Sequence, residues 1–258
     1  MKGDALKPSM ILLATTIVVL LAALWRHYQP PDRDLAFPAG EIVIGVDGSF
    51  PPYAFDAGGA LAGLDVELGA AIAAEIGLPV RFVNLSFYGL YDALITGEVD
   101  LLMAALRVDP ARMDDVRYTR PYFDNGLVLV TASFGVPLNG AAQTGTALAF
   151  EYASGADSQI RAWEQEGQSF ARMPYELPTH ALDALRLGQT DAALVDASTL
   201  HLYAKEHAEW DYRREFVTRE LYAIALRINR DDAWKLVDSA LGALKERGEL
   251  AKIVDRWF

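Results

Sequence analysis

Short apolar runs alternate with longer amphipathic segments from Glu41 to the end of the chain. The runs that predict strands are 42–46, 80–84, 100–104, 127–131, 147–150, 191–195 and 223–226. Residues 64–76 place apolar side chains at every fourth position, which predicts an amphipathic helix, and residues 231–245 repeat this pattern. Such alternation predicts an α/β fold in which a mostly parallel sheet is covered by helices on both faces. Ligands of these sheets bind beyond the carboxyl ends of the strands.

The N-terminal segment has a different pattern, because residues 10–25 contain no charged side chain and Arg26 follows them. The run is longer than most signal-peptide cores, slightly shorter than a full membrane span, and lacks a good small-residue cleavage site. We therefore predict that residues 1–28 form an uncleaved membrane anchor rather than a cleaved signal. The rest of the chain is then expected in the periplasm or on the extracellular face. Residues 29–40 hold three prolines and are predicted to be a linker.

Composition narrows the possible partners. The chain has 258 residues, 52% of them hydrophobic, which is enough for one large domain or two smaller lobes. Its formal net charge of −12 argues against nucleic acid as a partner, because phosphates are bound by Lys and Arg. The sequence has no cysteine, which excludes disulfides, thiol catalysis and zinc–thiolate sites.

No sequence motif predicts an enzyme, a metal site or a cofactor. The four histidines are not spaced as metal ligands on one helix face. The chain has no G-x-S-x-G elbow and no phosphate-binding glycine loop, and G-x-G-x-x-G does not follow the first strand. These observations favour a binding protein that needs no cofactor.

Six segments occur in an order and spacing typical of one protein family. They are IGVDGSFPPYAF (44–55), GLDVELGAAIAAEIG (63–77), FYGLYDALITGEVDLLMAAL (87–106), DPARMDDVRYTRPYF (109–123), LRLGQTDAALVD (185–196) and the terminal ELAKIVDRWF. From about Glu41 to Phe258, the chain resembles the type II periplasmic solute-binding proteins for polar amino acids, family 3. These proteins are the capture subunits of ABC importers. Any one of these segments is weak evidence for the family, whereas six in the right order are strong evidence.

The resemblance implies a two-lobed fold. Each lobe would be a mostly parallel sheet flanked by helices, and two crossing strands would join the lobes. The first lobe would comprise residues 41–124 and 222–258, and the second residues 125–221. A monomer would capture a small polar amino acid between the closing lobes. It would then present the ligand to an ABC permease in the membrane to which residues 10–25 anchor it.

The resemblance also implies ligand-binding residues of opposite charge. Arg112 matches the arginine that binds the ligand carboxylate, a role suited to its planar fork of donors. Asp196 matches the second-lobe carboxylate that binds the ammonium group. Asp47 matches a position that often contacts ligand side chains. Each has a structural alternative, namely a surface arginine, a helix N-cap and a turn residue.

Four further positions are implied to line the site. Phe50 and Phe87 match two rings that sandwich the ligand side chain, although both could instead be core aromatics. Ser154 lies at a predicted strand-to-helix junction, where free backbone amides bind anions. The backbone around Ala105 matches a carbonyl acceptor.

Two departures from the family pattern matter for the site. Arg107 stands where a small hydroxyl residue is usual, and Asp109 replaces the usual threonine of the Thr-x-x-Arg motif. The two side chains could pair with each other, or Arg107 could enter the cleft and select a ligand with a second negative group. Asp47, Arg107, Arg112 and Asp196 contribute two charges of each sign, which weakly favours a near-neutral ligand.

Two other functions remain open at this point. One is a ligand-sensing ectodomain, suggested by the uncleaved anchor, although we expect no built-in output module in this chain. The other is an enzyme resembling a cyclohexadienyl dehydratase. Such an enzyme would need a proton donor in the cleft, for which Glu151 is the candidate.

Overall fold

The computed structural model describes residues 31–132 and 145–258, together with Val19. The predicted membrane anchor, residues 10–25, otherwise lies outside the described residues. In the part of the chain that is described, no helix combines the length and the apolar character needed to cross a membrane.

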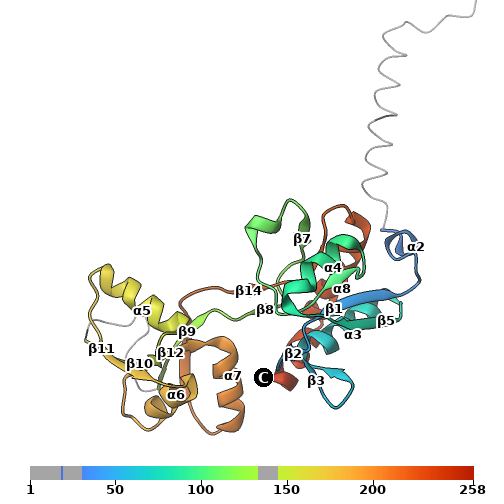
Figure 1. The fold of residues 1–258 in the computed structure, drawn as a ribbon. Helices are drawn as coiled ribbons and strands as arrows, with labels where there is room; N and C mark the ends of the chain where they lie inside the picture. The colour runs from blue at the N-terminus through green and yellow to red at the C-terminus, as the bar shows by residue number, and fades with distance from the viewer. Residues whose placement is uncertain (1–18, 20–30, 133–144) are drawn as a thin grey trace, which may run out of the picture.

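Two mixed sheets, each covered by helices, form two separate bodies (Figure 1). The first sheet has the strand order β5-β1-β6-β15-β7. Its strands are β1 (Ile42–Val46), β5 (Val80–Asn84), β6 (Leu101–Leu102), β7 (Val116–Tyr118) and β15 (Ala225–Arg227). Strand β1 pairs in parallel with β5 and β6, whereas β15 is antiparallel to β6 and β7.

Helices cover both faces of the first sheet. They are α3 (Leu64–Ile76), α4 (Leu90–Thr96), α8 (Asp231–Glu246) and α9 (Glu249–Trp257). Ile42, Ile44 and Val46 of β1 point into a core shared with α3, α8 and α9. Val43 lies in a second cluster with α4, on the opposite face of the sheet.

The segment predicted as a linker is partly docked on this body. Residues 33–36 form helix α2 (Arg33–Ala36), which begins at Asp32, whose side chain accepts hydrogen bonds from two amides of the helix. Ala36 and Phe37 are buried in the same core as α8. Residues 33–37 of the segment predicted as a linker are therefore packed on the first body, because two apolar side chains there have a core to enter.

The second sheet has the order β11-β10-β12-β9-β13. Its strands are β9 (Leu127–Ala132), β10 (Ala147–Glu151), β11 (Ala171–Tyr175), β12 (Ala192–Asp196) and β13 (Tyr212–Phe216). Its helices are α5 (Gly155–Gln165), α6 (Pro178–Arg186) and α7 (Ala197–Glu206). The core on one face contains α6 and α7, and the core on the other contains α5. Strand β10 pairs in parallel with β11 and β12, whereas β9 is antiparallel to β12 and β13.

Two short strands connect the bodies. Strands β8 (Phe123–Asp124) and β14 (Leu221–Tyr222) pair in antiparallel fashion and run side by side between the two sheets (Figure 1). The polypeptide therefore crosses between the bodies at two adjacent points, an arrangement that permits hinge closure.

Smaller elements complete the first body. They are the strands β2 (Ser49–Phe50), β3 (Ala54–Asp56) and β4 (Leu61–Ala62) and the short 3₁₀ helices η1 (Phe87–Gly89) and η2 (Pro110–Arg112), of which β2, η1 and η2 contribute residues to the region between the bodies. Lys205 of α7 also donates a hydrogen bond to the backbone oxygen of Arg256 in α9, at 2.8 Å, across the gap between the bodies.

The predicted α/β architecture, with two lobes of helix-covered sheet, is confirmed. The predicted bounds of β1, β5 and α3 are those observed. The sheets are more mixed than the mostly parallel sheets predicted, because each has antiparallel strands on one side.

Candidate functional site

A single cleft of about 1580 Å³ brings together side chains from both sheets and from the connecting strands. All eight predicted site residues line it: Asp47, Phe50, Phe87, Ala105, Arg107, Arg112, Ser154 and Asp196. The first six come from the body of the first sheet, whereas Ser154 and Asp196 come from the second.

Arg112 lies at the end of η2 and is fixed by two neighbours. Its guanidinium carbon is 3.8 Å from the centre of the Tyr91 ring, and its Nε is 3.5 Å from Oδ2 of Asp109. Asp109 begins η2 and accepts a hydrogen bond from the amide of Ala111 at 2.9 Å. About half of the Arg112 side chain remains exposed, so its donors can reach a ligand in the cleft.

Asp196 ends β12 and begins α7. Its Oδ1 accepts hydrogen bonds from the Thr199 amide at 2.8 Å and the Ser198 hydroxyl at 2.6 Å, and its Oδ2 accepts one from the Thr199 hydroxyl at 2.7 Å. The residue is therefore an N-cap and also a carboxylate in the cleft.

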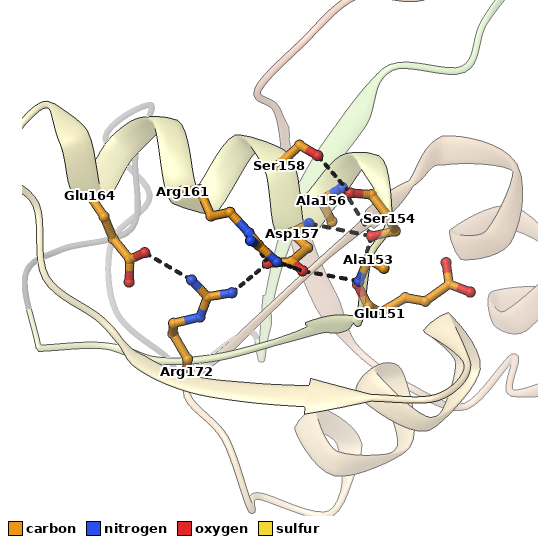
Figure 2. A network of polar contacts seen from close by, with 9 residues as sticks. All are labelled: Glu151, Ala153, Ser154, Ala156, Asp157, Ser158, Arg161, Glu164 and Arg172. Atoms are coloured by element: carbon orange, nitrogen blue, oxygen red, sulfur yellow. Dashed lines mark hydrogen bonds and ion pairs between the residues drawn. The ribbon is translucent and has the colours of Figure 1, made fainter.

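Ser154 begins α5 and is held by a polar network (Figure 2). Its hydroxyl donates to the Glu151 carbonyl at 2.7 Å and accepts from the amides of Ala156 and Asp157. Buried Asp157 accepts a 3.0 Å hydrogen bond from the Ala153 amide and pairs with Arg161 and Arg172. Hydrogen bonding from Arg161 and neighbouring donors lowers the pKa of Asp157 to about 2.

Glu151 also lines the cleft, as the alternative enzymatic interpretation requires. Its carboxylate lies apart from the arginines of the Asp157 network (Figure 2).

Asp47 has both of the roles considered for it, because its side chain stabilises a turn and also lines the cleft. Its Oδ1 accepts hydrogen bonds from the amide of Ser49 at 3.0 Å and from its hydroxyl at 2.6 Å. Oδ1 is therefore engaged locally, and the side chain still faces the cavity.

The aromatic residues divide between cleft and core. Phe50 and Phe87 are 47% and 56% exposed, so neither is a core ring. Phe50 stacks on Tyr53, which is buried, with ring centres 5.2 Å apart. Phe55 packs edge-on against Trp257.

Arg107 pairs with a residue that the sequence did not suggest. Its Nε is 3.4 Å from Oε1 of Glu220, the residue before β14, and no contact with Asp109 accompanies this pair among the described residues. The predicted alternative of an Arg107–Asp109 pair is therefore not observed, because Asp109 instead caps η2. Burial raises the pKa of the Glu220 carboxyl, and the Arg107 charge partly offsets that effect.

Ala105 has a backbone φ of +46°, a conformation that residues with a Cβ seldom adopt. Its amide donates a 2.9 Å hydrogen bond to Oδ2 of Asp65, which is fully buried behind the cleft. Asp65 is among the residues that sequence reasoning did not select.

Several other cleft residues were also not predicted. Charged side chains among them are Asp92, Asp109, Arg219 and Glu220. Asn125, next to β8, donates to the Tyr222 hydroxyl at 3.1 Å and accepts from the Ser198 amide at 2.9 Å. It therefore links a connecting strand to the start of α7. No local sequence signal marks Asn125 or Glu220, since strand pairing brings both to the cleft.

Comparisons with known proteins agree with this geometry. The profile of the family described as "Bacterial extracellular solute-binding proteins, family 3" matches residues 42–258. The chain is 24% identical over 229 residues to the ABC transporter arginine-binding protein 1 of Escherichia coli, covering 86% of this chain and 93% of that protein. It is 26% identical to the L-arginine-binding protein of Pseudomonas aeruginosa, covering 84% and 87% of the two chains.

A solved structure supports the fold. The L-cystine solute receptor of Neisseria gonorrhoeae, in the unliganded open conformation, superimposes with a TM-score of 0.72. It is 22% identical, and the match covers 87% of this chain and 95% of the other. From Ile42 to its last residue, the chain belongs to the bacterial extracellular solute-binding proteins, family 3.

Proposed function

We propose that this protein captures a cationic amino acid in the cleft and delivers it to an ABC permease after the lobes close. The lobes would comprise residues 41–124 and 222–258 on one side and residues 125–221 on the other. The observation that carries the proposal is that Arg112 and Asp196 line one cleft from different bodies. A zwitterion between them would bridge the two bodies, so ligand binding would favour the closed state.

The charge of the cleft supports a ligand with a positive side chain. Six carboxylates line the cleft, namely Asp47, Asp92, Asp109, Glu151, Asp196 and Glu220, against three arginines, Arg107, Arg112 and Arg219. Arg107 is paired with Glu220, and Arg219 donates to Asp124 at 2.6 Å. The charged side chains that line the cleft therefore carry a net negative charge. The four charged residues selected from the sequence had instead carried two charges of each sign.

Glu220 also argues against selection of a second carboxylate by Arg107. An arginine that already has a carboxylate partner 3.4 Å away has less to gain from a ligand anion. The names of the two curated relatives, both of which refer to arginine binding, point to the same ligand class.

Isothermal titration of the purified full-length chain tests the proposal. We expect L-arginine, L-lysine or L-ornithine to bind with a dissociation constant of about 1 µM or below, which corresponds to at least about 8 kcal/mol. L-Glutamate should bind far more weakly. Binding of neutral or acidic amino acids alone would contradict the cationic class. Failure of every amino acid to bind a folded sample would contradict amino-acid capture itself.

The enzymatic alternative is tested separately. Both curated relatives are named as binding proteins. Because Glu151 lines the cleft, incubation with prephenate or arogenate is the direct experiment, and we expect no aromatic product.

A further inference from the structure

Asp65 is a fully buried carboxylate that is connected to the cleft wall through one of its hydrogen-bond partners, Ala105. It lies in the first turn of α3 and is 0% exposed. Its Oδ1 accepts a 2.6 Å hydrogen bond from the Tyr122 hydroxyl, and its Oδ2 accepts the 2.9 Å bond from the Ala105 amide. A buried carboxylate is costly unless hydrogen bonds satisfy it, so both donors are needed at these positions.

The first partner is a strained residue of the cleft wall. Ala105 follows β6 and adopts φ +46°, a left-handed conformation that is unfavourable for a residue with a Cβ. Such a conformation persists only where the surrounding structure holds it. The bond from the Ala105 amide to Asp65 is a restraint of this kind, and it reaches the cleft from inside the first body.

The second partner leads into the connection between the bodies. Tyr122 immediately precedes β8, and its amide donates to the Tyr222 carbonyl of β14 at 2.9 Å. Its ring is buried, so the hydroxyl has a fixed position. One carboxylate therefore ties the cleft wall at Ala105 to the start of the first connecting strand.

We propose that Asp65 is a positioning residue for ligand binding, which holds the Ala105 turn in its binding conformation and fixes that turn relative to the hinge strands. This inference rests on the proposed function only in the choice of ligand. Asp65 binds no ligand itself, because it is fully buried and does not line the cleft.

A simpler role would be to stabilise α3 alone, since an acidic residue in the first turn interacts favourably with the helix dipole. That role affects stability without changing the cleft. The two roles are separated by comparing Asp65→Leu with Leu68→Ala, a change at another fully buried position of α3.

Amide hydrogen exchange measured by NMR gives a readout that needs no ligand. In Asp65→Leu we expect the Ala105 amide to exchange about tenfold faster or more, relative to the global opening rate, because its acceptor is gone. In Leu68→Ala that ratio should be unchanged. Asp65→Asn should restore protection, because its Oδ1 can accept from Ala105 while its Nδ2 donates to the Tyr122 hydroxyl.

Affinity for L-arginine is the second readout. Asp65→Leu should bind it about tenfold more weakly than the wild type, whereas Asp65→Asn and Leu68→Ala should stay within about threefold. Equal affinity and equal Ala105 protection in Asp65→Leu and Leu68→Ala would overturn the proposal. If the wild type does not bind L-arginine, the proposed ligand is wrong, and the exchange experiment still decides the role of Asp65.

The wild type alone provides a test if Asp65→Leu does not fold. Burial raises the pKa of Asp65 to about 7, and the hydroxyls of Tyr122 and Tyr53 are the titratable groups that face it. The Ala105 amide resonance should therefore shift with the Asp65 carboxyl carbon as that group titrates. An Ala105 amide that does not follow this titration would contradict the hydrogen bond on which the inference depends.

Discussion

The carboxylate of Asp196 accepts a 2.8 Å hydrogen bond from the Thr199 amide while it lines the ligand cleft. One residue thereby begins α7 and presents negative charge to the cavity. The Ser198 and Thr199 hydroxyls also donate to this carboxylate, so its orientation is fixed before any ligand arrives. Such preorganisation reduces the entropy lost on binding.

Replacing Asp196 by Asn separates the two roles. Asparagine is as good an N-cap as aspartate, so the unfolding free energy should change by less than about 1 kcal/mol. Affinity for the ligand should fall about tenfold or more, because a charged partner of the ammonium group is lost. Titration calorimetry and urea unfolding measure the two quantities. Asp32→Asn, at the N-cap of α2 and outside the cleft, is the matched control and should leave affinity unchanged. Unchanged affinity in Asp196→Asn would rule out its ligand role.

Arg112→Lys tests the need for a planar, two-pronged donor. Lysine keeps the charge and loses the fork, so affinity should fall about tenfold or more while the fold is retained. Arg117→Lys is a matched control, because Arg117 also stacks on an aromatic ring, that of Trp234 at 3.5 Å, but does not line the cleft. Equal affinities of the two variants, measured by calorimetry, would contradict carboxylate binding by Arg112.

The sequence predicted the apolar strands and missed two polar edge strands of the second sheet, for a physical reason. Strands β1 and β12 are buried on both faces and read as unbroken apolar runs. Strands β11 (ARMPY) and β13 (YRREF) lie at the edges of their sheet, where one side is open to solvent and polar residues are tolerated. They carry no hydrophobic pattern, so they were missed.

The candidate site divides in the same way. Residues inside recognisable segments, such as Arg112 and Asp196, could be selected from the sequence, and both line the cleft. Glu220 could not be selected, because its position depends on the pairing of β14 with β8. The Glu220 amide donates a hydrogen bond to Asp124, which lies 96 residues earlier in the chain. Asp65 lay inside a selected segment, but its bond to Ala105 is likewise a tertiary contact.

Glu220→Gln should change ligand preference as well as affinity. Removing this carboxylate leaves the Arg107 charge without its 3.4 Å partner, so the cleft becomes more positive by one unit. Affinity for L-arginine should fall by roughly threefold to tenfold, and binding of L-glutamate should strengthen relative to it. Competition titrations measure the ratio. Arg107→Ala in the same background should abolish the gain for L-glutamate. A ratio that Glu220→Gln leaves unaltered would show that Arg107 does not face the ligand.

Two phenylalanines near the cleft should respond differently to truncation. Phe50 is 47% exposed in the cleft wall, so Phe50→Ala should weaken ligand binding about tenfold with little loss of stability. Phe55 packs on Trp257, so Phe55→Ala should cost about 2 kcal/mol of unfolding free energy and leave the affinity of the folded protein intact. Calorimetry and urea unfolding on both variants give the comparison. Intact affinity in Phe50→Ala would remove that ring from the site.

Asp65 should give the protein a stability that depends on pH between about 4 and about 7. Burial raises the pKa of this carboxyl from 3.8 to about 7 in the folded protein, so between these values the folded state holds a proton that the unfolded state has released. Stability from this group is therefore greatest near pH 4, falls as the pH rises towards 7, and levels off above that. Asp157 has a pKa lowered to about 2, so it contributes in the opposite direction only at more acidic pH. Urea unfolding of the wild type and of Asp65→Asn across this range isolates the effect, because asparagine does not titrate. We expect the difference in unfolding free energy between the two proteins to favour the wild type most at the acidic end. A difference that stays constant with pH would mean that Asp65 remains ionised in the core.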